Sequence, residues 1–132
     1  MNSWTNDELR GMRVSKVMIV DDDVVMVKLL QTLLELDGFN ISIVNRGADV
    51  IGQARSVQPD IFLIDFHLTD MDGTEIVKQL RGDADFADKP IIVASGLDVE
   101  DDVIKAGATA FLIKPFEPSD LPGLFNQLIS GA

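Results

Sequence analysis

Short apolar runs alternate with segments of helical spacing along most of the chain. Five runs rich in Val and Ile predict β-strands at Val17–Val20, Ile41–Val44, Ile61–Ile64, Ile91–Ala94 and Ala110–Ile113. Four of these runs lack polar alternation, which is typical of strands buried on both faces of a parallel sheet. The run that contains Ser42 is more polar and is expected at an edge. Strands that alternate with helical segments indicate an α/β fold with a parallel sheet.

Apolar residues recur at helical spacing after each predicted strand. The clearest stripe runs from Met26 to Leu36 and stops before Gly38, a residue that favours a left-handed helix end. The other stripes predict helices around Ala48–Ala54, Ile76–Leu80, Val99–Ala106 and Leu121–Leu128. We expect Ser119 to cap the last helix and Pro122 to lie in its first turn, where proline is tolerated.

Length and composition narrow the class of protein. A chain of 132 residues with 46% hydrophobic content fits one globular domain with its own core. Its 22 acidic and 11 basic side chains give a formal charge of −11, which repels phosphate backbones and anionic membrane surfaces. The chain has no cysteine, and no apolar run approaches the length of a membrane span. We therefore expect a soluble, cytoplasmic protein that binds neither nucleic acid nor membranes directly.

Residues 1–15 fall outside the alternating pattern. We interpret them as an N-terminal extension or linker, followed by a domain over residues 16–132. The segment from Thr5 to Glu8 fits a capping box, so a short helical turn with Trp4 as an anchor is the alternative.

Carboxylates follow two of the predicted strands at the point where each strand ends. Asp21, Asp22 and Asp23 come directly after the first strand, and Asp65 follows the third. Such carboxylates repel one another unless protons or a metal compensate their charge. Parallel strands open at one edge of a sheet, and ligands bind there where the strand order reverses. Clustered hard oxygens suit Mg²⁺, and an Asp in this position can also accept a phosphoryl group.

Two further polar residues follow the fourth and fifth strands. The hydroxyl of Ser95 could bond a phosphoryl oxygen, and the ammonium of Lys114 could pair first with a carboxylate and then with a phosphoryl group. Taken singly, a serine here is usually a turn residue and a lysine is usually solvated. Together with the acidic residues, however, they indicate a phosphate site at the ends of four strands.

In this order, the residues resemble the response-regulator receiver domains of two-component signalling. The resemblance covers residues 16–130 and rests on short motifs at the strand ends: Asp21-Asp22, Asp65, Met71-Asp72-Gly73, Ser95-Gly96 and Lys114-Pro115-Phe116. It implies a flavodoxin-like, doubly wound (βα)5 three-layer sandwich whose five-stranded parallel sheet has the order 2-1-3-4-5.

The resemblance also implies roles for the acidic residues. Asp65 is the expected phosphoacceptor for a phosphohistidine on a sensor histidine kinase or a histidine phosphotransfer protein. Asp22, Asp65 and the backbone carbonyl of His67 are the expected ligands of Mg²⁺ or Mn²⁺, with Asp21 acting mainly through water. Asp23 is interpreted as a cap or a first-turn acid of the following helix.

Ser95 and Phe111 resemble the switch pair of the family, with Lys114 as the charged partner of the phosphoryl group. Phosphorylation is expected to draw Ser95 and Lys114 inward and to let the Phe111 ring turn. This would alter the face made by the fourth helix, fifth strand and fifth helix, where a downstream protein is expected to bind. The alternative for Phe111 is a permanent core ring, and a homodimer through the same helices is also open. We expect a cis peptide bond between Lys114 and Pro115.

One position departs from the family pattern, and two others are expected to influence the lifetime of the phosphoryl group. Thr69 stands where the family usually has proline. His67 and Leu97 are expected to lie beside the phosphoryl group, and Leu97 cannot orient a water molecule by hydrogen bonding. We therefore expect slow self-dephosphorylation. For His67, a surface imidazole without a role and a ligand of a softer metal are the alternatives.

Two other classes of protein share parts of this pattern. A phosphatase with an Asp nucleophile would also have carboxylates at the ends of parallel strands, but it usually needs a second Asp where this chain has His67. A degenerate receiver could act as a constitutive interaction module, although such a scaffold would not need Asp22, Asp65, Ser95 and Lys114 together. A metabolic enzyme is not expected. The chain could be a free-standing regulator, a phosphorelay shuttle or a receiver cut from a longer protein.

Overall fold

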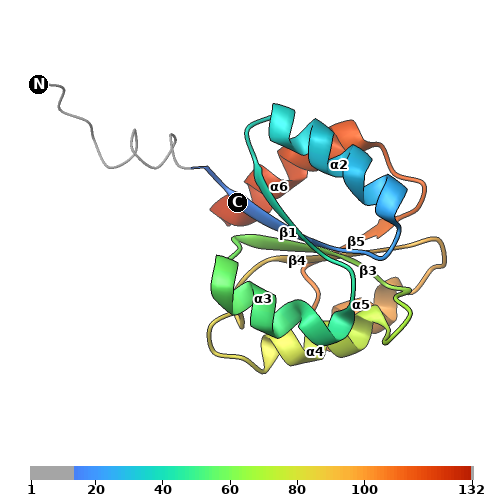
Figure 1. Ribbon diagram of the computed structural model, residues 1–132. Helices are drawn as coiled ribbons and strands as arrows, with labels where there is room; N and C mark the ends of the chain where they lie inside the picture. The colour runs from blue at the N-terminus through green and yellow to red at the C-terminus, as the bar shows by residue number, and fades with distance from the viewer. Residues whose placement is uncertain (1–13, 132) are drawn as a thin grey trace, which may run out of the picture.

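A parallel β-sheet lies between two layers of helices in the computed structural model, which describes residues 14–131 (Figure 1). Its strands are β1 (Lys16–Val20), β2 (Asn40–Val44), β3 (Ile61–Asp65), β4 (Ile91–Ser95) and β5 (Ala110–Ile113). They are paired in parallel in the order β2-β1-β3-β4-β5. The predicted fold class and strand order are therefore confirmed, and the strand that contains Ser42 lies at an edge.

The helices divide between the two faces of the sheet. One face carries α2 (Val24–Leu36) and α6 (Leu121–Ser130), and the other carries α3 (Val50–Val57), α4 (Gly73–Arg81) and α5 (Glu100–Ala106) (Figure 1). Two short 3₁₀ turns, η1 (Gly47–Asp49) and η2 (Pro118–Asp120), precede α3 and α6.

Alternate side chains of β1 pack on opposite faces of the sheet. Val17 and Ile19 belong to the apolar cluster under α2 and α6, whereas Met18 and Val20 belong to the cluster on the side of α3, α4 and α5. Because successive side chains of a strand point to opposite faces, Asp21 continues the row of Val17 and Ile19 toward the α2 side. The same alternation orders the side chains at the ends of the other strands.

The helix termini confirm two of the predicted capping signals and contradict one. Asp23 caps α2, since its carboxylate accepts a hydrogen bond from the Met26 N–H at 3.1 Å, and Gly38 after this helix has a φ of 92°. Ser119 does not cap α6, so that prediction was wrong. Ser119 lies inside the 3₁₀ turn η2, not at the position before a helix. The helix α6 begins at Leu121, and no side chain caps it.

Some sequence predictions concern residues beyond the described range. The capping box from Thr5 to Glu8 and the Trp4 anchor lie outside residues 14–131. Within that range, no helix is both long and apolar enough to cross a membrane.

Candidate functional site

Three carboxylates meet at the carboxyl ends of β1 and β3. One carboxylate oxygen from each of Asp21, Asp22 and Asp65 lies within 4.8 Å of the other two. The register pairs Val20 with Ile64, so the residues that end or follow these neighbouring strands come to one edge of the sheet. Asp21 and Asp65 are buried and Asp22 is half-buried. The expected convergence of the acidic residues is thus present in the structure.

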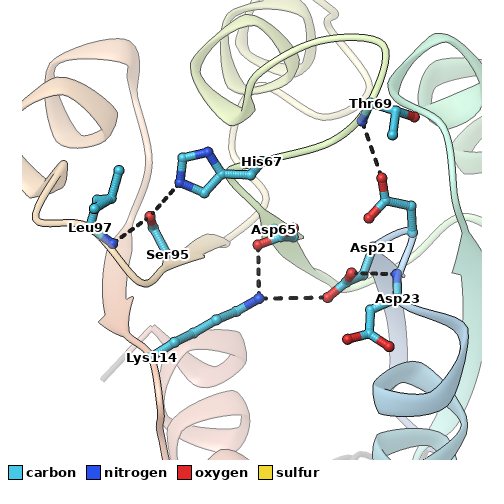
Figure 2. Close-up of polar contacts among 9 residues, drawn as sticks. Asp21, Asp23, Asp65, His67, Thr69, Ser95, Leu97 and Lys114 are labelled. Atoms are coloured by element: carbon cyan, nitrogen blue, oxygen red, sulfur yellow. Dashed lines mark hydrogen bonds and ion pairs between the residues drawn. The ribbon is translucent and has the colours of Figure 1, made fainter.

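Lys114 provides the positive charge of this cluster. Its Nζ atom lies 2.9 Å from Asp65 Oδ1 and 3.9 Å from Asp21 Oδ2 (Figure 2). Ala110 and Leu112 of β5 pack on the α2 and α6 side, so Lys114 continues their row toward the two carboxylates. The bond between Lys114 and Pro115 is cis, as expected.

Burial raises the pKa of the Asp21 carboxyl above its usual value. The hydrogen bond from the Asp23 N–H, at 2.9 Å, works against this shift, while the nearby charge of Asp65 adds to it. A raised pKa means that the folded protein holds the ionised form of Asp21 at a cost in stability.

Asp22 is held by the loop that follows β3. Its Oδ2 atom accepts a hydrogen bond from the Thr69 N–H at 3.1 Å (Figure 2). Proline, which is usual at this position in the family that the sequence resembles, has no N–H and could not make this bond. Thr69 therefore gives this chain an additional support for Asp22.

The same loop is anchored to the start of α3. The Asp70 carboxylate accepts hydrogen bonds from the N–H groups of Gly47 and Ala48, each at 2.9 Å, and these bonds lower the pKa of Asp70. Asp72 then caps α4 by accepting a bond from the Glu75 N–H at 3.1 Å. The anchoring role of Asp70 was not predicted, because no periodic pattern links two loops that are this far apart in sequence.

Ser95 lies on the opposite side of Asp65 from Asp21 (Figure 2). It is fully buried, and its Oγ atom accepts a hydrogen bond from the Leu97 N–H at 3.0 Å. His67 Nε2 lies 3.0 Å from the same oxygen. Phe111 is half-buried against the apolar cluster on the α5 side, so it is neither a fully packed core ring nor a free surface ring.

The donor set of the acidic cluster suits a hard cation. Carboxylate oxygens are the ligands that Mg²⁺ prefers, and this cluster contains three of them close together. Among residues 14–131, the acidic cluster includes no histidine or cysteine, so it offers no nitrogen or sulfur ligand for a softer metal. The residues therefore fit Mg²⁺ or Mn²⁺.

A family model for the response regulator receiver domain matches residues 17–126. The chain therefore belongs to the receiver-domain family of two-component systems, whose members are signalling switches. Its acidic pocket of Asp21, Asp22 and Asp65 fits the phosphoacceptor site of that family.

Curated relatives include longer regulators. The alkaline phosphatase synthesis transcriptional regulatory protein PhoP of Bacillus subtilis is 32% identical over 109 residues, which are 80% of this chain and 45% of the relative. The DNA-binding response regulator MtrA of Mycobacterium tuberculosis is 28% identical over 109 residues, or 80% and 46% of the two chains. The chain thus spans about half the length of these relatives.

Solved structures support the fold. The chemotaxis response regulator CheY4 of Vibrio cholerae has a TM-score of 0.81 at 24% identity, covering 88% of this chain and 99% of that one. The receiver domain of a sensor histidine kinase of Pseudomonas aeruginosa, solved with a magnesium ion coordinated in its active site cleft, has a TM-score of 0.80 at 22% identity. This alignment covers 89% of this chain and 99% of the other. At these identities the two structures establish the fold alone.

Substitution of Asp21 by Asn tests the repulsion within the cluster. At neutral pH and without divalent ions, Asp21→Asn is expected to raise the Tm by on the order of a few degrees, because it removes a buried charge but keeps an acceptor for the Asp23 N–H. The gain should shrink as the pH falls, since the raised pKa of Asp21 lets the parent become neutral there. Thermal unfolding at several pH values measures both effects. Asp23→Asn, which changes an exposed helix cap, serves as the control. A lower Tm than the parent at neutral pH would contradict the interpretation.

Thr69→Pro tests the support of Asp22. We expect Mg²⁺ to bind roughly three- to tenfold more weakly, because one hydrogen bond to the carboxylate is lost. Thr69→Ala keeps the backbone N–H and serves as the matched control, which should bind like the parent. Calorimetric titration gives both affinities, and equal affinities for the proline and alanine variants would show that the bond contributes nothing.

Proposed function

We propose that the chain accepts a phosphoryl group on Asp65 from a phosphohistidine of a sensor histidine kinase or histidine phosphotransfer protein. The observation that carries this proposal is the buried Asp65 carboxylate, 2.9 Å from the Lys114 ammonium and beside the carboxylates of Asp21 and Asp22. An anionic nucleophile flanked by a fixed cation and by further oxygen ligands suits phosphoryl transfer, where positioning and charge neutralisation do most of the work.

In the proposed reaction, a carboxylate oxygen of Asp65 attacks phosphorus and the bond to the histidine nitrogen breaks, which leaves an acyl phosphate. Lys114 neutralises part of the charge on the phosphoryl oxygens from its place beside Asp65. Mg²⁺ or Mn²⁺, held by Asp22, Asp65 and the backbone carbonyl of His67, with Asp21 acting through water, would supply further charge neutralisation when bound. These assignments make the domain a switch, with no metabolic substrate.

The proposed output is a shift in the face made by α5, β5 and α6. The phosphoryl group adds roughly −1.5 to −2 charges at neutral pH, which attracts the Ser95 hydroxyl and the Lys114 ammonium. The Phe111 ring is half-buried at this face and so has room to change its packing when the loop after β4 moves. A downstream protein, or a second copy of the chain, would bind there, and the formal charge of −11 argues against direct binding to nucleic acid.

Labelling with a small phosphodonor tests the assignment of Asp65. With acetyl phosphate and Mg²⁺, the parent is expected to take up about one phosphoryl group per chain in an acid-stable, hydroxylamine-labile bond. Asp65→Asn should abolish this label, because its amide is not a nucleophile. Asp23→Asn is the matched control, since asparagine also caps a helix and Asp23 lies outside the acidic cluster.

Two results would contradict the proposal. Full labelling of Asp65→Asn would assign the acceptor elsewhere. Rapid turnover of varied phosphate esters, without a stable label on the parent, would instead favour the Asp-nucleophile phosphatase.

We also propose that His67 and Leu97 tune the lifetime of the phosphoryl group. The Leu97 side chain is exposed and carries no polar group to orient water, so the acyl phosphate should decay slowly. Leu97→Glu is expected to speed the decay several-fold, whereas Leu97→Ala, which lacks a polar group as well, should have a much smaller effect. Loss of label over time measures both rates. A fast decay in the parent would refute this prediction.

A further inference from the structure

The contact between His67 and Ser95 joins the loop after β3 to the end of β4. His67 Nε2 lies 3.0 Å from Ser95 Oγ (Figure 2). The serine is fully buried, whereas the histidine is exposed and its ring packs edge-on against Phe66, with ring centroids 4.8 Å apart. The imidazole therefore reaches from the surface to a buried hydroxyl.

The direction of this hydrogen bond follows from a count of protons. A serine hydroxyl has one proton to donate and can accept two. The Leu97 N–H already donates to Ser95 Oγ at 3.0 Å, so this contact cannot take the hydroxyl proton. Within residues 14–131, His67 Nε2 is the remaining partner recorded for Ser95 Oγ. If the imidazole were also a donor, the buried hydroxyl proton would have no acceptor, which is unfavourable.

We propose that His67 is a positioning residue that accepts the Ser95 hydroxyl proton and thereby holds the hydroxyl in its resting orientation. This inference rests on the proposed function, in which Ser95 turns to the phosphoryl group on Asp65. The hydroxyl has a single proton, so it cannot donate to His67 and to a phosphoryl oxygen at once. Activation therefore requires that the bond to His67 is broken, and His67 opposes the switch.

The exposure of His67 agrees with this arrangement. An imidazole that accepts at Nε2 carries its proton on Nδ1, and an exposed ring can present that N–H to solvent. A single neutral hydrogen bond is expected to shift the balance between resting and switched Ser95 roughly two- to tenfold. His67 thus adjusts how easily the domain is activated through its bond to Ser95.

One spectroscopic experiment tests the bond directly. His67 is the only histidine of the chain, so labelling with ¹⁵N-histidine gives the signals of a single imidazole. In alkaline buffer, where a free imidazole is neutral, we expect the unphosphorylated parent to show an unprotonated, hydrogen-bonded Nε2. Ser95→Ala should move these signals toward those of a free imidazole, and phosphorylation with acetyl phosphate and Mg²⁺ should do the same. A protonated Nε2 in the parent, or signals unaffected by Ser95→Ala, would overturn the proposal.

A kinetic experiment tests the effect on activation. His67→Leu removes the acceptor and is expected to raise the rate of phosphorylation by subsaturating acetyl phosphate roughly two- to tenfold. His67→Gln retains an acceptor on a flexible side chain and should restore the rate toward that of the parent. In a Ser95→Ala background, His67→Leu should have no further effect, because the bond is already absent. An equal gain in both backgrounds would show that His67 acts by another route.

The two experiments separate failure of this inference from failure of the proposed function. If Asp65 is phosphorylated normally but His67→Leu leaves the rate unchanged, the inference is wrong and the phosphoacceptor assignment stands. If Asp65 is not phosphorylated, the proposed function fails, while the comparison of the unphosphorylated parent with Ser95→Ala still decides whether His67 accepts the Ser95 proton.

Discussion

Repulsion among three carboxylates is the constraint on which the carboxyl edge of this sheet depends. Asp21, Asp22 and Asp65 have oxygens within 4.8 Å of one another, and two of these side chains are buried. Like charges this close destabilise the fold unless donors or cations compensate them. The Lys114 ammonium and the N–H groups of Asp23 and Thr69 provide this compensation within the protein. Two of these donors come from the loops after β1 and β3, which direct their N–H groups at the carboxylates.

The strand register determines which side chains lie at this acidic site and which lie on the opposite face of the sheet. Asp21, Asp65 and Lys114 each continue a row of side chains on the α2 and α6 face, whereas Ser95 continues the row of Ile91 and Val93 on the other face. The Lys114 N–H nevertheless donates to the Ser95 carbonyl at 2.8 Å, so the backbones at the ends of β4 and β5 remain joined. A charge added at Asp65 can therefore act on one residue from each face at the same time.

Periodic features of the sequence predicted the fold well. The apolar runs located all five strands, with ends that differ by one residue at most, because a parallel ladder continues through polar residues such as Lys16, Asp65 and Ser95. The convergence of the acidic residues also required β1 and β3 to be neighbours, an order that the family resemblance implied. Loop contacts could not be predicted in this way, because backbone turns leave no periodic pattern of apolar residues. This is why the cap predicted at Ser119 was wrong and the anchor at Asp70 was missed.

The hydrogen bond between His67 and Ser95 illustrates why the resting state needs its own stabilising contacts. Without a phosphoryl group, the buried Ser95 hydroxyl would lack an acceptor for its proton, and a buried donor without a partner lowers stability. In our proposal, the histidine supplies that acceptor from the loop whose His67 carbonyl is also a proposed metal ligand. Under the proposed function, the resting and phosphorylated states differ in the acceptor of the Ser95 hydroxyl proton, which is the imidazole nitrogen in one and a phosphoryl oxygen in the other. Because the hydroxyl can donate to only one of these acceptors at a time, the proposal makes the residue at position 67 one determinant of the balance between the two states.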